Sequence, residues 1–208
     1  RTATVAYNNR GSIHRRNENF KQALQDFSQA IHQDSTYAHA YYNRGTTLKD
    51  WAGERNDKQL YRKAIPDFNK ALKYKSPFPE AYHNRGLCYD NLGQLDKALT
   101  DFNKAIKQDI NDYKIYVNRG VVKGKQGNLN EAISDFEKAL SIAPKQPDAL
   151  SNMGLAYSHK GNYKKALNYY KQAISADPEF ENAYYTRGLV QYKLQRYKAA
   201  IQSFTSAI

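Results

Sequence analysis

The sequence predicts an all-α protein made of tandem helix pairs that stack into a solenoid. Two observations carry this prediction. A phrase ending in glycine recurs six times along the 208 residues, and apolar residues within each copy recur at steps of three and four. Such steps place side chains on one face of an α-helix, and one helix pair cannot bury that face alone. Repeated pairs therefore have to cover one another.

The recurring phrase is Tyr-x-Asn-Arg-Gly, with changes in the last two copies. Its glycines lie 34 residues apart in four intervals and 41 residues apart in one. They are Gly11, Gly45, Gly86, Gly120, Gly154 and Gly188. An aromatic residue follows each glycine in the same phase, apart from the longer interval: Phe27, Phe68, Phe102, Phe136, Tyr170 and Phe204. Each copy is expected to form two amphipathic helices around a short turn such as Leu92-Gly93-Gln94.

These positions resemble the tetratricopeptide repeat family, whose 34-residue pattern places a large residue, Leu-Gly, Tyr, Ala, Phe, Ala and Pro at set offsets. The resemblance covers essentially the whole chain and implies a right-handed superhelical solenoid of tandem antiparallel helix pairs. One solenoid over residues 1–208 would hold repeats 4–37, 38–78, 79–112, 113–146, 147–180 and a truncated 181–208. Because the chain starts without Met and stops inside a repeat, we expect a segment of a longer protein.

Arginine and aspartate vary together between the copies. The residue before each glycine is Arg10, Arg44, Arg85, Arg119, Met153 and Arg187. The residue before each later aromatic is Asp26, Asp67, Asp101, Asp135, Tyr169 and Ser203. The copy that loses its arginine also loses its aspartate, which predicts a guanidinium–carboxylate pair within a repeat or between neighbours. Such pairs would neutralise four positive charges. The alternative is that the five arginines form a basic stripe facing a ligand.

The second repeat carries seven extra residues near 54–60. We expect them to lengthen the turn between its two helices and to project from one face. Insertions of this kind often carry the contacts that are particular to one family member. The insertion includes the single tryptophan, Trp51, and the alternative is a tolerated loop whose Trp51 packs on its own helices. Pro66 is expected in the first turn of the second helix, where its missing N–H is harmless.

An asparagine recurs two residues before the glycine in five copies. These residues are Asn9, Asn43, Asn84, Asn118 and Asn152, and only Thr186 departs. An amide offers both a donor and an acceptor, so a ladder of them can bond the backbone of an extended peptide. In the family this position lines the concave groove, and the pattern is similar to the ladder of O-linked N-acetylglucosamine transferases. The alternative is a role in packing or solvation.

Flanking groove positions would give specificity. Beside the asparagines we expect Tyr42, His83, Lys49, Lys114 and Lys125 to contact the ligand. Basic groups outnumber acidic ones at both ends of the groove, so an acidic or carboxylate-bearing peptide fits it best. The carboxylate clamp that grips chaperone tails is not matched, since only Asn43 agrees when its pattern starts at the first repeat.

Composition weighs against other classes of function. The net charge is +12, but the excess is largest in the second repeat, mainly on a helix that faces outwards in the family. Nucleic-acid binding is disfavoured because most aromatic residues fall on core positions. No metal spacing or catalytic constellation occurs around the single cysteine, Cys88, or the five histidines, so we expect no enzyme and no cofactor.

The sequence therefore predicts a protein-interaction scaffold that binds an extended peptide or a partner helix in the concave groove. The competing prediction is a structural subunit of a large assembly that uses its convex face, its edges and the second-repeat insertion. No apolar stretch approaches the length of a membrane span, and we expect an intracellular, cytoplasmic protein.

Overall fold

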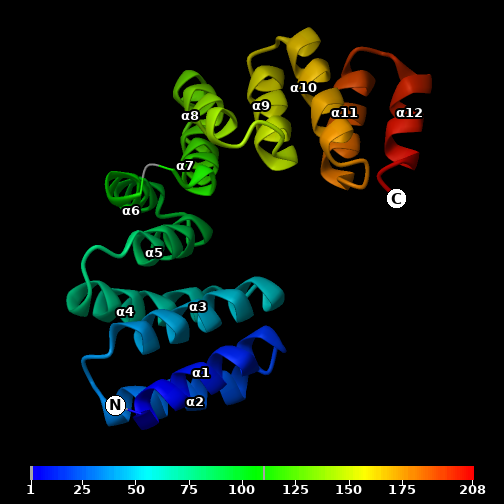
Figure 1. The fold of residues 1–208 in the computed structure, drawn as a ribbon. Coiled ribbons are helices and arrows are strands. Elements are labelled where there is room, and N and C mark those ends of the chain that lie inside the picture. Colours follow the sequence, from blue (N-terminus) through cyan, green and yellow to red (C-terminus); the bar gives the residue numbers. More distant parts are fainter. Residues whose placement is uncertain (1, 110) are drawn as a thin grey trace. The chain divides into compact units, whose positions relative to one another are not determined.

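The computed structural model describes residues 2–109 and 111–208. In these residues every regular element is an α-helix, and the helices follow one another as hairpins (Figure 1). The chain divides into two compact units, Arg1–Ile110 and Asn111–Ile208. Each unit holds three successive helix pairs, so the predicted all-α architecture of tandem pairs is confirmed.

In each pair the odd-numbered helix comes first. The first unit contains α1 (Thr2–Arg16), α2 (Phe20–Gln33), α3 (Ala38–Arg55), α4 (Lys58–Tyr74), α5 (Pro79–Asn91) and α6 (Leu95–Gln108). The second unit contains α7 (Tyr113–Lys125), α8 (Leu129–Ile142), α9 (Pro147–His159), α10 (Tyr163–Ala176), α11 (Glu181–Lys193) and α12 (Tyr197–Thr205).

The turn inside each pair contains one residue in the left-handed backbone region. Glycine holds this place in three turns, for example Gly127 with φ of 83°. Glycine is favoured there because it has no Cβ to clash with the following carbonyl. In the other three turns the residue is Glu18, Asn56 or Gln195. The first helix therefore ends at the same distance from the recurring glycine in five repeats, and about one turn later in the second repeat, where α3 continues to Arg55.

The recurring glycine lets the two helices of a pair approach closely. A Cβ added at Gly120 of α7 would lie 2.6 Å from Cε1 of Phe136 on α8, which is closer than packed carbon atoms come. Ala132 and Ala139 on either side of Phe136 are fully buried. The small residues and the ring thus form one close-packed contact, as the repeat pattern predicts.

The predicted arginine–aspartate pairs are confirmed, and each joins the two helices of one repeat. Arg85 donates from Nε to Oδ2 of Asp101 and from Nη2 to Oδ1, both at 2.7 Å. Asp101 is only 2% exposed, so the fork supplies the hydrogen bonds that a buried carboxylate requires. The same fork joins Arg10 to Asp26, Arg44 to Asp67, and Arg119 to Asp135.

The two repeats that lack the aspartate replace the ion pair differently. In the fifth repeat Met153 is buried, and Tyr169 instead stacks on Tyr157 with the ring centroids 5.5 Å apart. In the sixth repeat Arg187 donates to the hydroxyl of Ser203 at 3.0 Å. The co-variation seen in the sequence therefore reflects direct contact across the helix pair.

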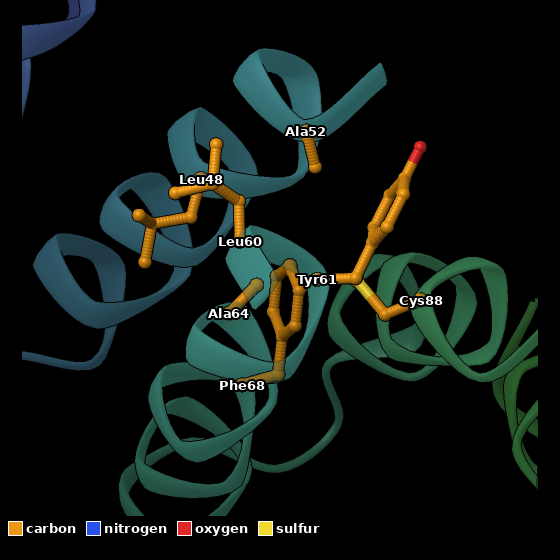
Figure 2. Packing of buried hydrophobic residues seen from close by; sticks show 7 residues of the cluster. All are labelled: Leu48, Ala52, Leu60, Tyr61, Ala64, Phe68 and Cys88. Carbon is orange, nitrogen blue, oxygen red and sulfur yellow. The ribbon is translucent and has the colours of Figure 1, made fainter. Parts of the chain in front are cut away.

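The prediction of a projecting loop in the second repeat is wrong. The seven extra residues lengthen both helices, because α3 continues to Arg55 and α4 begins at Lys58. Apolar residues continue at helical spacing through the insertion. They are part of a buried cluster that α3, α4 and α5 form together (Figure 2). The cluster consists of Leu48, Ala52, Leu60, Tyr61, Ala64, Phe68 and Cys88.

Two single-residue expectations in this repeat have different outcomes. Trp51 packs against the cluster formed mostly by its own two helices, and it also stacks on Phe20 of α2 with centroids 6.0 Å apart. Pro66 lies inside α4 rather than in its first turn. The helix tolerates it because Pro66 and Arg62, whose carbonyl loses its helical donor, are both exposed, so water can reach that side of the helix.

Candidate peptide-binding face

First helices of neighbouring repeats contact one another. In the first unit α1 contacts α3 and α3 contacts α5, and in the second unit α7 contacts α9 and α9 contacts α11. Within each unit, the described residues of second helices of neighbouring repeats make no such contact. Each unit is therefore concave on the side of its first helices. We call the solvent-facing side of α1, α3 and α5 the first inner face, and that of α7, α9 and α11 the second inner face.

On the first inner face the predicted asparagines bond to neighbouring helices. Asn43 of α3 donates to Oδ1 of Asn8 on α1 at 2.9 Å. Asn84 of α5 donates to the hydroxyl of Tyr42 on α3 at 3.0 Å. Tyr42 is itself half-buried, with its ring 4.8 Å from that of Phe78, and burial raises its pKa. These side chains hold successive repeats together, whereas Asn9 is exposed.

The charged groups of the first inner face also pair within the protein. Arg15 of α1 reaches Asp50 of α3 at 2.9 Å, and Lys49 reaches the other carboxylate oxygen at 3.0 Å. His83 lies edge-on to Phe102 with centroids 5.8 Å apart. The predicted ligand residues Lys49 and His83 therefore have contacts inside the first unit.

The second inner face carries its predicted residues on α7 and α9, with Thr186 at the corresponding place on α11. Asn118 and Asn152 are half-buried on α7 and α9, and Thr186 donates to the carbonyl of its own helix at Asn182, 2.7 Å away. Lys114 is exposed in the first turn of α7, where its backbone N–H bonds to the Asp112 cap. Lys125 is exposed at the end of the same helix.

A hollow of about 230 Å³ opens between α7 and α9, and we call it the α7–α9 hollow. Its floor is apolar and comes from α8, while α7 and α9 form the walls. The floor residues are Leu129, Ala132 and Phe136. The wall residues are Gly120, Val121, Gly124, Lys125, Asn152, Leu155, Ala156 and His159. Of the asparagines and lysines predicted from the sequence, this site brings together Asn152 and Lys125.

Two rows of side chains run across the second inner face at the 34-residue period. The apolar row is Val121, Leu155 and Leu189. The basic row is Lys125, His159 and Lys193. Leu155 and Leu189 are 40% and 46% exposed, so the row presents apolar surface to solvent. Tyr185 and Tyr192 of α11 add exposed rings to the same face.

The apolar row was not among the ligand residues predicted from the sequence. Its signal is present nonetheless, because the residue after the recurring glycine is Ser12 and Thr46 in the first two repeats and an aliphatic residue in the last four, beginning with Leu87. An aliphatic residue beside a core glycine is easily taken for core. Only the structure shows that Leu155 and Leu189 remain in contact with solvent.

One further polar group lies beneath this face. The hydroxyl of Tyr170 is buried beside Thr186 without an aligned hydrogen bond, and burial raises its pKa to about 12. The other five repeats carry phenylalanine at this place. The Cys88 thiol is buried in the first unit, and burial raises its pKa to about 12 as well, so it is not a nucleophile at neutral pH.

The geometry by itself defines a class of protein, in which helix hairpins stack and their first helices form a concave face. Sequence profiles of the tetratricopeptide repeat match residues 4–37, 79–112, 112–179 and 151–208, which is well over half of the chain. The chain belongs to the tetratricopeptide repeat family. Proteins of this family are scaffolds for protein–protein interaction and assembly.

Solved structures agree with the fold. YrrB, described as a protein of this family with an unusual peptide-binding site, is 28% identical with a TM-score of 0.66, over 85% of this chain and 88% of that one. MamA is 24% identical with a TM-score of 0.72, over 85% and 93%. PilF of Pseudomonas aeruginosa is 19% identical with a TM-score of 0.79, over 97% and 89%. No curated protein matches the sequence.

Within residues 2–109 and 111–208, no helix combines the length and the apolar character that crossing a bilayer requires.

Proposed function

We propose that this protein binds a peptide segment of a partner protein on the second inner face. The single observation that carries the proposal is the apolar row at the α7–α9 hollow, in which Leu155 and Leu189 are exposed. Exposed aliphatic side chains in a regular row are typical of a surface that another chain covers. The peptide-binding site named for YrrB supports a ligand of the same kind here.

The predicted asparagine ladder contributes unequally to this function. Asn43 and Asn84 already donate to Asn8 and Tyr42, so part of their bonding capacity is used within the first unit. Asn152 lines the α7–α9 hollow and makes no side-chain hydrogen bond to the described residues. Its amide can accept from a peptide N–H and donate to a peptide carbonyl at the same time. Asn118, Lys114 and Lys125 stay candidates on the same face, and the chain needs no catalytic group for this role.

The test is panning of a displayed random-peptide library on the immobilised protein. The double variant Leu155→Ser, Leu189→Ser should lose most of the captured peptides, because it removes the aliphatic contacts of the second inner face. Ile201→Ser is the control, since Ile201 is an aliphatic residue on the second helix α12 and is more exposed than either leucine. Capture that survives the double variant and fails with Ile201→Ser would move the site to the outer side.

A specific observation also favours the second candidate function, a structural role that uses the outer side. The second helix of the extended repeat, α4, exposes Arg62, Lys63, Lys70 and Lys73. A cluster of this kind favours an acidic protein partner through long-range attraction. Replacing these four residues by Gln should then abolish assembly with the partner, while peptide capture by the second inner face remains.

A further inference from the structure

We infer that the α7–α9 hollow takes one large aliphatic side chain of an acidic peptide, so that the partner segment combines an aliphatic anchor with nearby carboxylates. This inference rests on the proposed function, because it specifies the chemistry of a peptide bound on the second inner face. Four properties of the site support it: its size, its lining, the glycine that keeps it open, and the charges beside it.

The size and lining of the hollow suit a side chain rather than a small molecule. Its volume of about 230 Å³ lies below the range of roughly 300–1,000 Å³ that is usual for small-molecule sites. Ala132 and Phe136 form an apolar floor, and Val121 and Leu155 stand on opposite walls. An aliphatic group placed there would exchange water for carbon contacts on several sides, which is the favourable term in such burial.

Gly124 keeps the hollow open, and the fold does not require it. A Cβ added at Gly124 would meet only the Cβ of Ala132, at an ordinary 4.0 Å. At Gly120, one turn earlier, a Cβ would come within 2.6 Å of Phe136. The other repeats carry Arg15, Lys49, Asp90, Ser158 and Tyr192 at the place of Gly124. Glycine near the end of a helix lowers helix stability, so its presence here is explained by the space it leaves.

The charges beside the hollow favour acidic residues in the part of the peptide that flanks the anchor. Lys125 and His159 belong to its lining, and no acidic side chain does. Lys193 continues the basic row on the next first helix, with its ammonium 5.3 Å from the ring of Tyr163. Peptides with Asp or Glu near the anchor would therefore meet cationic groups, whereas basic peptides would be repelled.

The spacing of the helices fixes how far apart anchor and carboxylate stand. Packed helices lie roughly 8–10 Å apart, and an extended chain advances about 3.3 Å per residue, so one repeat corresponds to about three peptide residues. A side chain in the α7–α9 hollow would thus place the residue three positions away near Leu189 and Lys193 of α11. We expect the carboxylates within about three residues of the anchor.

The experiment is selection of a displayed random-peptide library on the whole chain, followed by affinity measurement for the selected peptides. Gly124→Leu fills the hollow, and Gly53→Leu is the matched control, because Gly53 is an exposed helical glycine of the first unit. The selected peptides should carry a large aliphatic residue flanked by Asp or Glu. Their affinity should fall by about tenfold or more for Gly124→Leu, as expected for loss of one buried leucine-sized contact, and stay unchanged for Gly53→Leu.

Charge reversal supplies the second arm. For Lys125→Glu with Lys193→Glu, the same selection should no longer favour acidic peptides, while the aliphatic residue persists. Circular dichroism of each variant shows that helicity is retained. Peptides that bind Gly124→Leu as tightly as the original protein, or that lack an aliphatic or acidic residue, overturn the inference. If those peptides are still lost with Leu155→Ser, Leu189→Ser, the proposed function stands without it, and capture of no peptide at all overturns both.

Discussion

The two units have the same fold, but the side chains of their inner faces differ in what they contact. On the first inner face, asparagine, tyrosine and charged side chains bond across neighbouring helices, as in the contacts of Asn84 with Tyr42 and of Arg15 with Asp50. On the second inner face, Leu155 and Leu189 stay exposed beside a hollow. Repeats with the same fold can therefore use their inner faces either to join helices to each other or to offer a surface to a partner.

The largest effect on stability is expected for the arginine–aspartate pair, which all three repeats of the first unit have and the last two repeats of the second unit lack. Arg85→Met in the third repeat leaves the carboxylate of Asp101 buried without its fork, so the free energy of unfolding should fall by about 3–5 kcal/mol in urea titrations. Adding Asp101→Tyr copies the fifth repeat, with its Met153 and Tyr169, and should recover most of the loss. A single variant that unfolds like the original protein would mean that the pair contributes nothing to stability.

The next effect concerns the hydroxyl of Tyr170, at a place where all three repeats of the first unit carry phenylalanine. Tyr170→Phe removes a polar group without an aligned partner, so the protein should become more stable by about 1–3 kcal/mol. The reverse change, Phe102→Tyr in the first unit, should lower stability because it buries a hydroxyl at the equivalent place. Thermal and urea unfolding measure both changes. A loss of stability in Tyr170→Phe would show that the hydroxyl is satisfied in solution, for example by water.

A smaller effect tests the two roles of the asparagines directly. Asn84→Ala deletes the hydrogen bond to Tyr42 and should lower the free energy of unfolding by about 1 kcal/mol. Asn152→Ala removes no such bond, so unfolding should stay unchanged while affinity for a captured peptide falls. Equal stability losses in both variants would contradict the distinction between the two inner faces.

The smallest effect comes from the glycine beside the hollow. Gly124→Ala should raise the free energy of unfolding by about 0.5–1 kcal/mol, because alanine favours the helix and its methyl group meets no close neighbour. Gly120→Ala is the matched comparison and should lose stability through the clash with Phe136. If Gly124→Ala destabilises the protein, the glycine has a role in packing, and its explanation by the hollow fails.

Most of the fold could be predicted from the sequence, because a repeat reports each contact several times. The joint loss of arginine and aspartate in the fifth repeat was enough to predict the pair between Arg85 and Asp101. The insertion was misjudged because an added segment suggests a loop, whereas Ala52 and Leu60 continue the helical spacing on either side of Asn56 and Asp57.

The candidate site could be predicted only in part. The asparagines are visible in the sequence, but whether an amide bonds to a neighbouring repeat depends on side chains from elsewhere, such as Asn8 for Asn43 and Tyr42 for Asn84. The exposure of Leu155 and Leu189 depends on the curvature of the helix stack, which the sequence pattern does not express. The hollow depends on the absence of a side chain at Gly124, and a missing group is harder to recognise than a motif.

The extended hairpin of α3 and α4 indicates how this architecture can grow. Seven residues correspond closely to two α-helical turns, and they are divided as about one turn on each helix. Every side chain after the insertion therefore returns to the face it would have occupied without it, as the burial of Ala64 and Phe68 indicates. The hairpin therefore becomes longer while the same faces of its helices stay buried. Lengthening of other hairpins in this chain should be tolerated in the same increment, whereas an addition of two or five residues would rotate a core face into solvent.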